Sequence, residues 1–145
     1  MTSLTKRIIT ALVLLPIAIG IVLLSQLPWF ALIVALVFGL AGWEWTRLCG
    51  VDSLLARCLL VVAFLALCAL LWMLRDTQIW WLTIALGVCW WAVALLWFRH
   101  VVFGAAPLAR NVAIKLLAGG FVLVPAWVAA VQLHANPDRG PFWVL

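Results

Sequence analysis

The sequence has too little charge for a water-soluble domain. Only 9% of its 145 residues are charged, whereas a soluble domain carries roughly 25%. Hydrophobic residues make up 70% of the chain, and its mean hydropathy is +1.31. We therefore interpret the chain as an integral membrane protein. The net charge is +5, but the basic residues are scattered singly at the edges of apolar runs, so the sequence predicts no binding to nucleic acid.

The sequence also lacks the motifs of several enzyme classes. It contains no GxxxxGK[ST] phosphate loop, no GxGxxG turn, no GxSxG elbow and no HExxH pair. Its four cysteines show neither CxxC spacing nor histidines at zinc-site distances, so we expect neither a metal site nor a disulfide. We expect His100 and His134 in loops on opposite sides of the membrane, which excludes a joint site.

Long apolar runs are what the sequence does contain. A bilayer core about 30 Å thick needs roughly 20 apolar residues in a helix. The runs predict helices at residues 8–27, 29–45, 58–74, 79–98 and 112–133, with a sixth starting near residue 142. The fold class expected is therefore all-α, a polytopic transmembrane helix bundle of about five spanning helices plus the start of a sixth. Residues 1–145 are expected to form a single transmembrane domain, the N-terminal portion of a longer protein.

The basic residues predict the orientation of this bundle. Two lie near the N-terminus, and two each lie in the loops after the second and fourth expected helices: Lys6, Arg7, Arg47, Arg57, Arg99 and Arg110. The alternate loops carry one basic residue or none. By the positive-inside rule, the N-terminus and the loops at residues 46–57 and 99–111 are cytoplasmic.

Glu44 lies between two tryptophans at the end of the second apolar run. On a helix, Glu44 is spaced to pair with Arg47, and Trp43 is spaced for a cation-π contact with Arg47. One interpretation is an interfacial anchor that ends the helix. The other is a headgroup or ion site, because ionisable residues near membrane depth are costly and often functional.

A second group of candidate residues lies at the start of the fifth run. Lys115 and Asn111 fall on one helix face, with Arg110 beside them. A cation just inside a cytoplasmic helix end can hold a lipid phosphate, although snorkelling to the interface and a topology signal are the more common reasons for such residues. Further along the run, Gly119 and Gly120 predict close helix packing. The tryptophans that lie away from helix ends, at positions 90, 91 and 127, are also expected to pack inside the bundle.

Four segments in a fixed order carry a resemblance to a known family. They are residues 6–11 (KRIITA) with 14–16 (LLP), residues 41–45 (AGWEW) with Leu48, residues 90–96 (WWAVALL) and residues 120–127 (GFVLVPAW). This pattern resembles the N-terminal half of bacterial phosphatidate cytidylyltransferase (CDP-diacylglycerol synthase), and the resemblance covers essentially the whole chain.

The resemblance implies a multi-pass enzyme of phospholipid biosynthesis in the bacterial inner membrane. Its substrates would be CTP and phosphatidic acid, its products CDP-diacylglycerol and pyrophosphate, and its surroundings the membrane lipids. Nucleotidyl transfer of this kind needs divalent metal held by carboxylates, so Mg²⁺ is expected for the complete enzyme.

This chain alone has only four acidic residues, and the topology leaves only Glu44 and Asp52 on the cytoplasmic side. The family's Asp-rich and His-Gly-Gly motifs are expected after Leu145. We therefore assign no catalytic residue and no metal ligand here, and we expect the chain to be inactive alone. Glu44, Arg47, Arg110 and Lys115 remain as candidates at the substrate headgroup or the interface. The alternative function is a small non-enzymatic membrane protein, such as an assembly partner or transporter subunit, and a homo-oligomer is left open.

Overall fold

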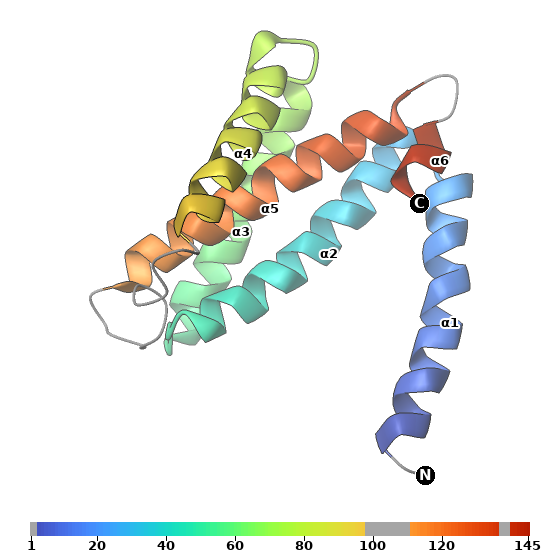
Figure 1. Cartoon of the computed structure of the whole chain (residues 1–145), viewed down its shortest axis with the longest axis horizontal. Coiled ribbons are helices and arrows are strands. Elements are labelled where there is room, and N and C mark those ends of the chain that lie inside the picture. The colour runs from blue at the N-terminus through green and yellow to red at the C-terminus, as the bar shows by residue number, and fades with distance from the viewer. Residues whose placement is uncertain (1–2, 98–110, 137–139) are drawn as a thin grey trace. The chain divides into compact units, whose positions relative to one another are not determined.

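The computed structural model describes residues 3–97, 111–136 and 140–145. Within these ranges the chain forms helices and no strand, which confirms the predicted all-α class (Figure 1). The helices are α1 (Ser3–Leu24), α2 (Leu27–Leu48), α3 (Leu54–Met73), α4 (Gln78–Trp97), α5 (Val112–His134) and α6 (Gly140–Val144).

Four of the described helices are long and apolar enough to cross a membrane. These spans are Leu27–Leu48, Leu54–Met73, Gln78–Leu96 and Val112–His134, and α1 adds a shorter apolar stretch, Leu12–Leu24. Helices suit a bilayer because they satisfy their own backbone hydrogen bonds where water is absent. The prediction of a polytopic membrane protein is thus confirmed. That residues 1–145 form one transmembrane domain stays a prediction.

The chain divides into two compact units. One comprises residues 1–32 and 130–145, and the other comprises residues 33–129. The candidate residues that the structure describes all belong to the second unit.

Helix α2 ends in a glycine motif that sets the geometry of the α2–α3 connection. Gly50 has a φ of +86°, the Gly50 amide donates to the Arg47 carbonyl, and the Val51 amide donates to the Thr46 carbonyl. This pair of bonds is a Schellman motif. The helix therefore continues past the expected end at residue 45, because the fall in hydropathy marks the membrane interface and not the end of the backbone helix. Ser53 then caps α3 by accepting a hydrogen bond from the Ala56 amide.

Replacing Gly50 with alanine is expected to destabilise the protein by about 1 kcal/mol, because a side chain raises the energy of the left-handed conformation. Thermal unfolding of the detergent-solubilised protein measures the effect. Gly20→Ala is the matched control, since Gly20 lies inside α1, where an added Cβ meets nothing within 4 Å. An equal loss in both variants would contradict the assignment of strain to Gly50.

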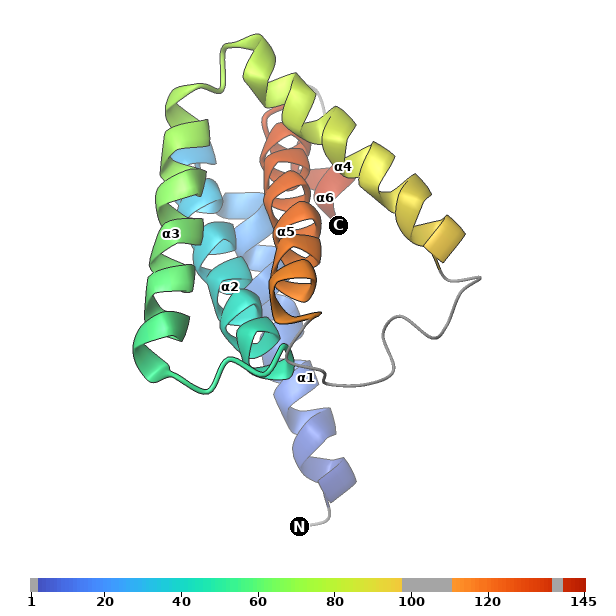
Figure 2. The same ribbon diagram turned by 90° about the vertical axis from the view of Figure 1, so that its left-hand side faces the viewer.

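In the unit of residues 33–129, α4 packs on α5 through aromatic rings and one glycine. Trp80 and Trp127 meet edge to face with ring centroids 5.8 Å apart, and Trp90 stacks on Phe121 at 5.2 Å. Gly87 faces Pro125 so closely that an added Cβ would collide with the proline ring. Figure 2 shows α3 alongside α2 and α5 in this unit. Packing inside the bundle is confirmed for Trp90 and Trp127, but Trp91 is 54% exposed.

In the unit of residues 1–32 and 130–145, α6 packs against α1, and His134 is buried. The His134 ring stacks on Phe30 with centroids 4.0 Å apart, and its Nε2 lies 3.0 Å from the Val22 carbonyl oxygen. The expectation that His134 lies in a loop is therefore wrong, because the hydrogen-bonded ladder of α5 continues through it. His100 lies outside the described residues.

Candidate functional site

The candidate site lies where the C-terminal end of α2 meets the N-terminal part of α5. The Trp45 indole Nε1 donates a 2.9 Å hydrogen bond to the Lys115 carbonyl. Gly119 lies directly against the same indole, so that a Cβ at this position would overlap Trp45. Close approach at Gly119 and the indole bond together hold these two helix ends in register. The prediction of close packing is confirmed at Gly119, with Trp45 as the partner, and is wrong at Gly120, where an added Cβ meets nothing within 4 Å.

Arg57 is the cation that binds the end of α2. Its guanidinium carbon lies 4.0 Å from the centre of the Trp43 ring, within the range of a cation-π contact. Arg57 Nη2 donates to the Trp43 carbonyl at 3.2 Å, and Arg57 Nε donates to Thr46 Oγ1 at 3.4 Å. Thr46, only 5% exposed, in turn donates to the Trp43 carbonyl. Arg57 is thus held half-buried in the first turn of α3 by groups that carry no negative charge.

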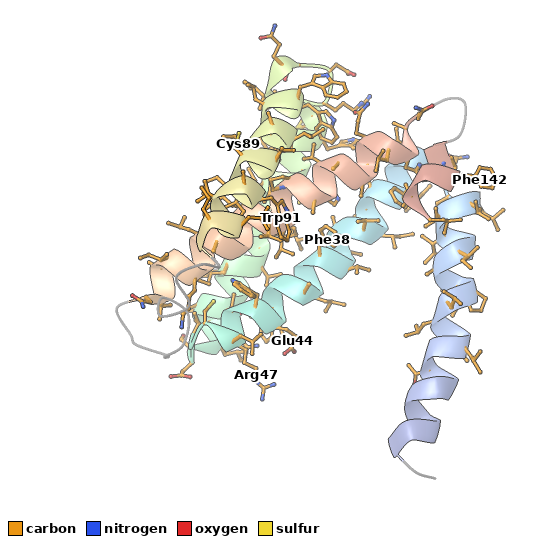
Figure 3. All side chains as sticks on the ribbon, in the orientation of Figure 1. Phe38, Glu44, Arg47, Cys89, Trp91 and Phe142 are labelled. Carbon is orange, nitrogen blue, oxygen red and sulfur yellow. The ribbon has the colours of Figure 1, made fainter. Side chains whose placement is uncertain are left out.

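The pairing expected for Trp43 is therefore corrected. Arg57, and not Arg47, stacks on Trp43, because the α2–α3 connection folds the first turn of α3 back over the end of α2. Within the described residues, Glu44 and Arg47 form no ion pair, and both side chains are exposed. Figure 3 shows them at the end of α2, pointing away from its ribbon.

Sequence reasoning treated Arg57 only as a topology signal. Arg57 is the fourth residue of α3, in the first turn after the Ser53 cap, and this closeness to the end of α2 along the chain was the available sign. Of the other candidates, Lys115 lies in α5 and is half-buried, and Arg110 lies outside the described residues. Assignment of Glu44, Arg47, Arg110 and Lys115 to a headgroup or interface stays a prediction.

Lys115 also lies close enough to Cys49 to act on its thiol. Cys49 is 3% exposed, and burial raises its pKa, while the Lys115 ammonium acts in the opposite direction. Because burial has the larger effect, the thiol stays protonated at neutral pH. A protonated thiol is a poor nucleophile, so Cys49 serves packing at this site.

The described residues do not fit a magnesium site. No group of three histidine, cysteine or acidic side chains comes together among them. Glu44 and Asp52, which lie nearest along the chain to the site, are both exposed. Mg²⁺ prefers several oxygen ligands in near-octahedral geometry, and this part of the chain supplies no such set.

Two apolar cavities open between the helices of this unit. The first, called here the α2 cavity, has a volume of about 390 Å³ and is lined by α2, α3 and α5, including Trp45 and Thr46. The second, the α4 cavity, has a volume of about 430 Å³ and is lined by α3, α4 and α5. The two cavities adjoin, because the same residues of α3 and α5 line both: Leu60, Leu67, Leu116, Leu117, Gly120 and Val124.

Comparison with known proteins gives one family. The model of the cytidylyltransferase family matches residues 5–145. A phosphatidate cytidylyltransferase of Pseudomonas aeruginosa is 35% identical over 139 residues, which cover 92% of this chain and 48% of the relative. The chain therefore spans about half the length of that curated relative. No solved structure gives a significant match.

Proposed function

The chain belongs to the cytidylyltransferase family, and from this premise we propose that it forms the N-terminal part of a membrane-embedded phosphatidate cytidylyltransferase. The observation that supports the proposal most is the family match over residues 5–145, together with 35% identity to an enzyme of that name. The four apolar spans fit an enzyme whose lipid substrate never leaves the bilayer.

The reaction proposed is nucleotidyl transfer. A phosphate oxygen of phosphatidic acid attacks the α-phosphorus of CTP, and the bond from that phosphorus to the oxygen bridging to the β-phosphorus breaks. The products are CDP-diacylglycerol and pyrophosphate. Both substrates are anionic, so their approach is aided by positive charge near the membrane surface. The described part of the chain offers such charge at Arg47, Arg57 and Lys115, close to the end of α2.

The role proposed for this chain is to hold and orient, since its described residues provide no Mg²⁺ ligand set. We place the metal that the family's reaction needs, and the carboxylates that bind it, in a part of the enzyme outside these residues. The location proposed is the bacterial inner membrane, with the N-terminus and the α2–α3 connection in the cytoplasm, as the distribution of basic residues favours.

The test is conversion of labelled CTP and phosphatidic acid to CDP-diacylglycerol in isolated membranes. Membranes containing the product of the gene's full reading frame are compared with membranes containing residues 1–145 alone, with and without Mg²⁺. We expect Mg²⁺-dependent product from the full frame and none from residues 1–145. No product from a well-expressed full frame would contradict the proposal and favour a non-enzymatic membrane protein. Product from residues 1–145 would contradict the placement of the metal ligands elsewhere.

A further inference from the structure

The α4 cavity has the length of one membrane leaflet. Along α3, the α4 cavity extends from Leu60 to Leu71, which corresponds to roughly 16 Å at 1.5 Å per residue. Half of a hydrocarbon core about 30 Å thick is roughly 15 Å. The α2 cavity begins at the same Leu60 and reaches Leu67. Both cavities therefore start near the end of α3 that carries Arg57, and the α4 cavity runs inward over about one leaflet.

Each cavity is an apolar space between three helices, of about 430 Å³ for the α4 cavity and about 390 Å³ for the α2 cavity. Their walls are almost wholly aliphatic or aromatic, with Gly39, Gly42 and Gly120 leaving the space open. A flexible hydrocarbon chain fits such a space, and two adjoining cavities offer room for two chains.

Arg57 lies beside one end of the α2 cavity without lining it. Thr46 and Trp45 line the cavity at that end, and Thr46 Oγ1 accepts the hydrogen bond from Arg57 Nε. Arg57 uses two of its five N–H donors on protein oxygens. Among the described residues it has no carboxylate partner. A half-buried guanidinium with donors to spare, at the interfacial end of an apolar cavity, is complementary to a lipid phosphate.

We propose that residues 33–129 bind one anionic diacyl phospholipid, with its two acyl chains in the α2 and α4 cavities and its phosphate at Arg57. Arg57 is pre-oriented by Trp43 and Thr46 to meet the phosphate, so little side-chain entropy is lost on binding. That this site holds a lipid for the enzyme rests on the proposed function. The binding of the lipid itself requires neither CTP nor turnover.

The experiment uses photoreactive lipids in vesicles. The protein is reconstituted in phosphatidylcholine vesicles containing phosphatidic acid that carries a diazirine midway along one acyl chain. A second sample contains phosphatidylcholine with the same labelled chain. After irradiation, mass spectrometry identifies the labelled residues. We expect the phosphatidic acid probe to label the residues that line the two cavities, and to label them more strongly than the phosphatidylcholine probe does.

A cavity-filling variant with a matched control tests where the chains lie. Gly120 lines both cavities, and an added Cβ there meets nothing within 4 Å, so Gly120→Leu fills the space without a backbone clash. Gly20→Leu is the control, because Gly20 is equally unobstructed and lines neither cavity. We expect Gly120→Leu to lower labelling of the cavity residues several-fold and Gly20→Leu to leave it unchanged. Equal labelling in the two variants, or labelling spread over the exposed face of α4, would overturn the proposal.

A charge variant with a matched control tests the headgroup. Arg57→Gln is expected to lower labelling by the phosphatidic acid probe about fivefold, the effect of one cation at a membrane surface, and to leave the phosphatidylcholine probe unaffected. Arg75→Gln is the control, since Arg75 stacks on Trp72 near the opposite end of α3. Equal labelling by both probes with no effect of Arg57→Gln would overturn the proposal and indicate unspecific boundary lipid.

The results also separate this proposal from the proposed function. Labelling of the cavities without enzyme activity in the full frame would refute the proposed function alone. Enzyme activity without labelling of the cavities would refute only this lipid site.

Discussion

Replacing Gly119 with alanine is expected to destabilise the junction between α2 and α5 by about 1–3 kcal/mol, the cost of overpacking a close contact. The added methyl group would overlap the Trp45 indole, whose nitrogen is fixed by its hydrogen bond to the Lys115 carbonyl. Either the indole moves and loses that bond, or α5 moves away from α2. Reversible unfolding of the detergent-solubilised protein, followed by tryptophan fluorescence or circular dichroism, measures the loss.

The neighbouring glycine provides the matched control for this substitution. Gly120→Ala adds the same methyl group one residue further along α5, where it meets nothing within 4 Å. Because alanine favours a helix over glycine by about 1 kcal/mol, Gly120→Ala should leave stability unchanged or raise it. Similar destabilisation by both variants would show that the cost arises from the helix and not from contact with Trp45.

A double-mutant cycle with Trp45 makes the test specific. Trp45→Ala removes the indole and its hydrogen bond, which is expected to cost about 1 kcal/mol or more. In that background Gly119→Ala has nothing to overlap, and its cost should vanish. The difference between the two backgrounds is the coupling energy of the pair, expected at about 1–3 kcal/mol. A coupling near zero would mean that the two residues do not touch in the membrane protein.

The fold class was predictable because a chain inside a bilayer must satisfy its backbone hydrogen bonds without water. Apolar runs of about 20 residues must become helices when no water is available to the backbone, and the described spans follow those runs. Positions where helices end were less predictable. Helix α2 continues through the interfacial residues to Leu48 and stops only where Gly50 adopts a positive φ. Hydropathy indicates where the chain leaves the membrane, and it does not indicate where the backbone helix ends.

Contacts between helices were predictable only where sequence spacing is short. Gly119 was expected to allow close packing, but nothing in its neighbourhood indicates Trp45, which is 74 residues away along the chain. The same limitation explains why the cation-π partner of Trp43 was predicted wrongly. Helical spacing indicated Arg47, whereas the α2–α3 turn brings Arg57 onto the Trp43 ring. The candidate site therefore combines residue types that the sequence indicated with partners that only the folded chain brings together.

Replacing His134 with alanine is expected to destabilise the unit of residues 1–32 and 130–145 by about 1–3 kcal/mol, the cost of leaving a buried polar group without its partner. Since a carbonyl oxygen only accepts, His134 Nε2 carries the proton and donates to Val22. Val22 lies in the last turn of α1, where carbonyls have no partner within the helix. The histidine thus satisfies a helix end from another part of the sequence, and its ring covers Phe30.

Two further substitutions separate the hydrogen bond from the ring. His134→Phe keeps an aromatic ring on Phe30 but leaves the Val22 carbonyl unpaired. His134→Gln keeps an N–H donor at about the position of Nε2 but loses the stacking. The buried Nδ1 has no partner among the described residues, so its loss in the phenylalanine variant offsets part of the cost. If the hydrogen bond contributes more than the ring, unfolding of reconstituted protein should show the His134→Gln variant to be more stable than His134→Phe, and His134→Phe more stable than His134→Ala. Alanine as stable as histidine would show that Val22 finds another donor, and that His134 contributes no net stability to the unit.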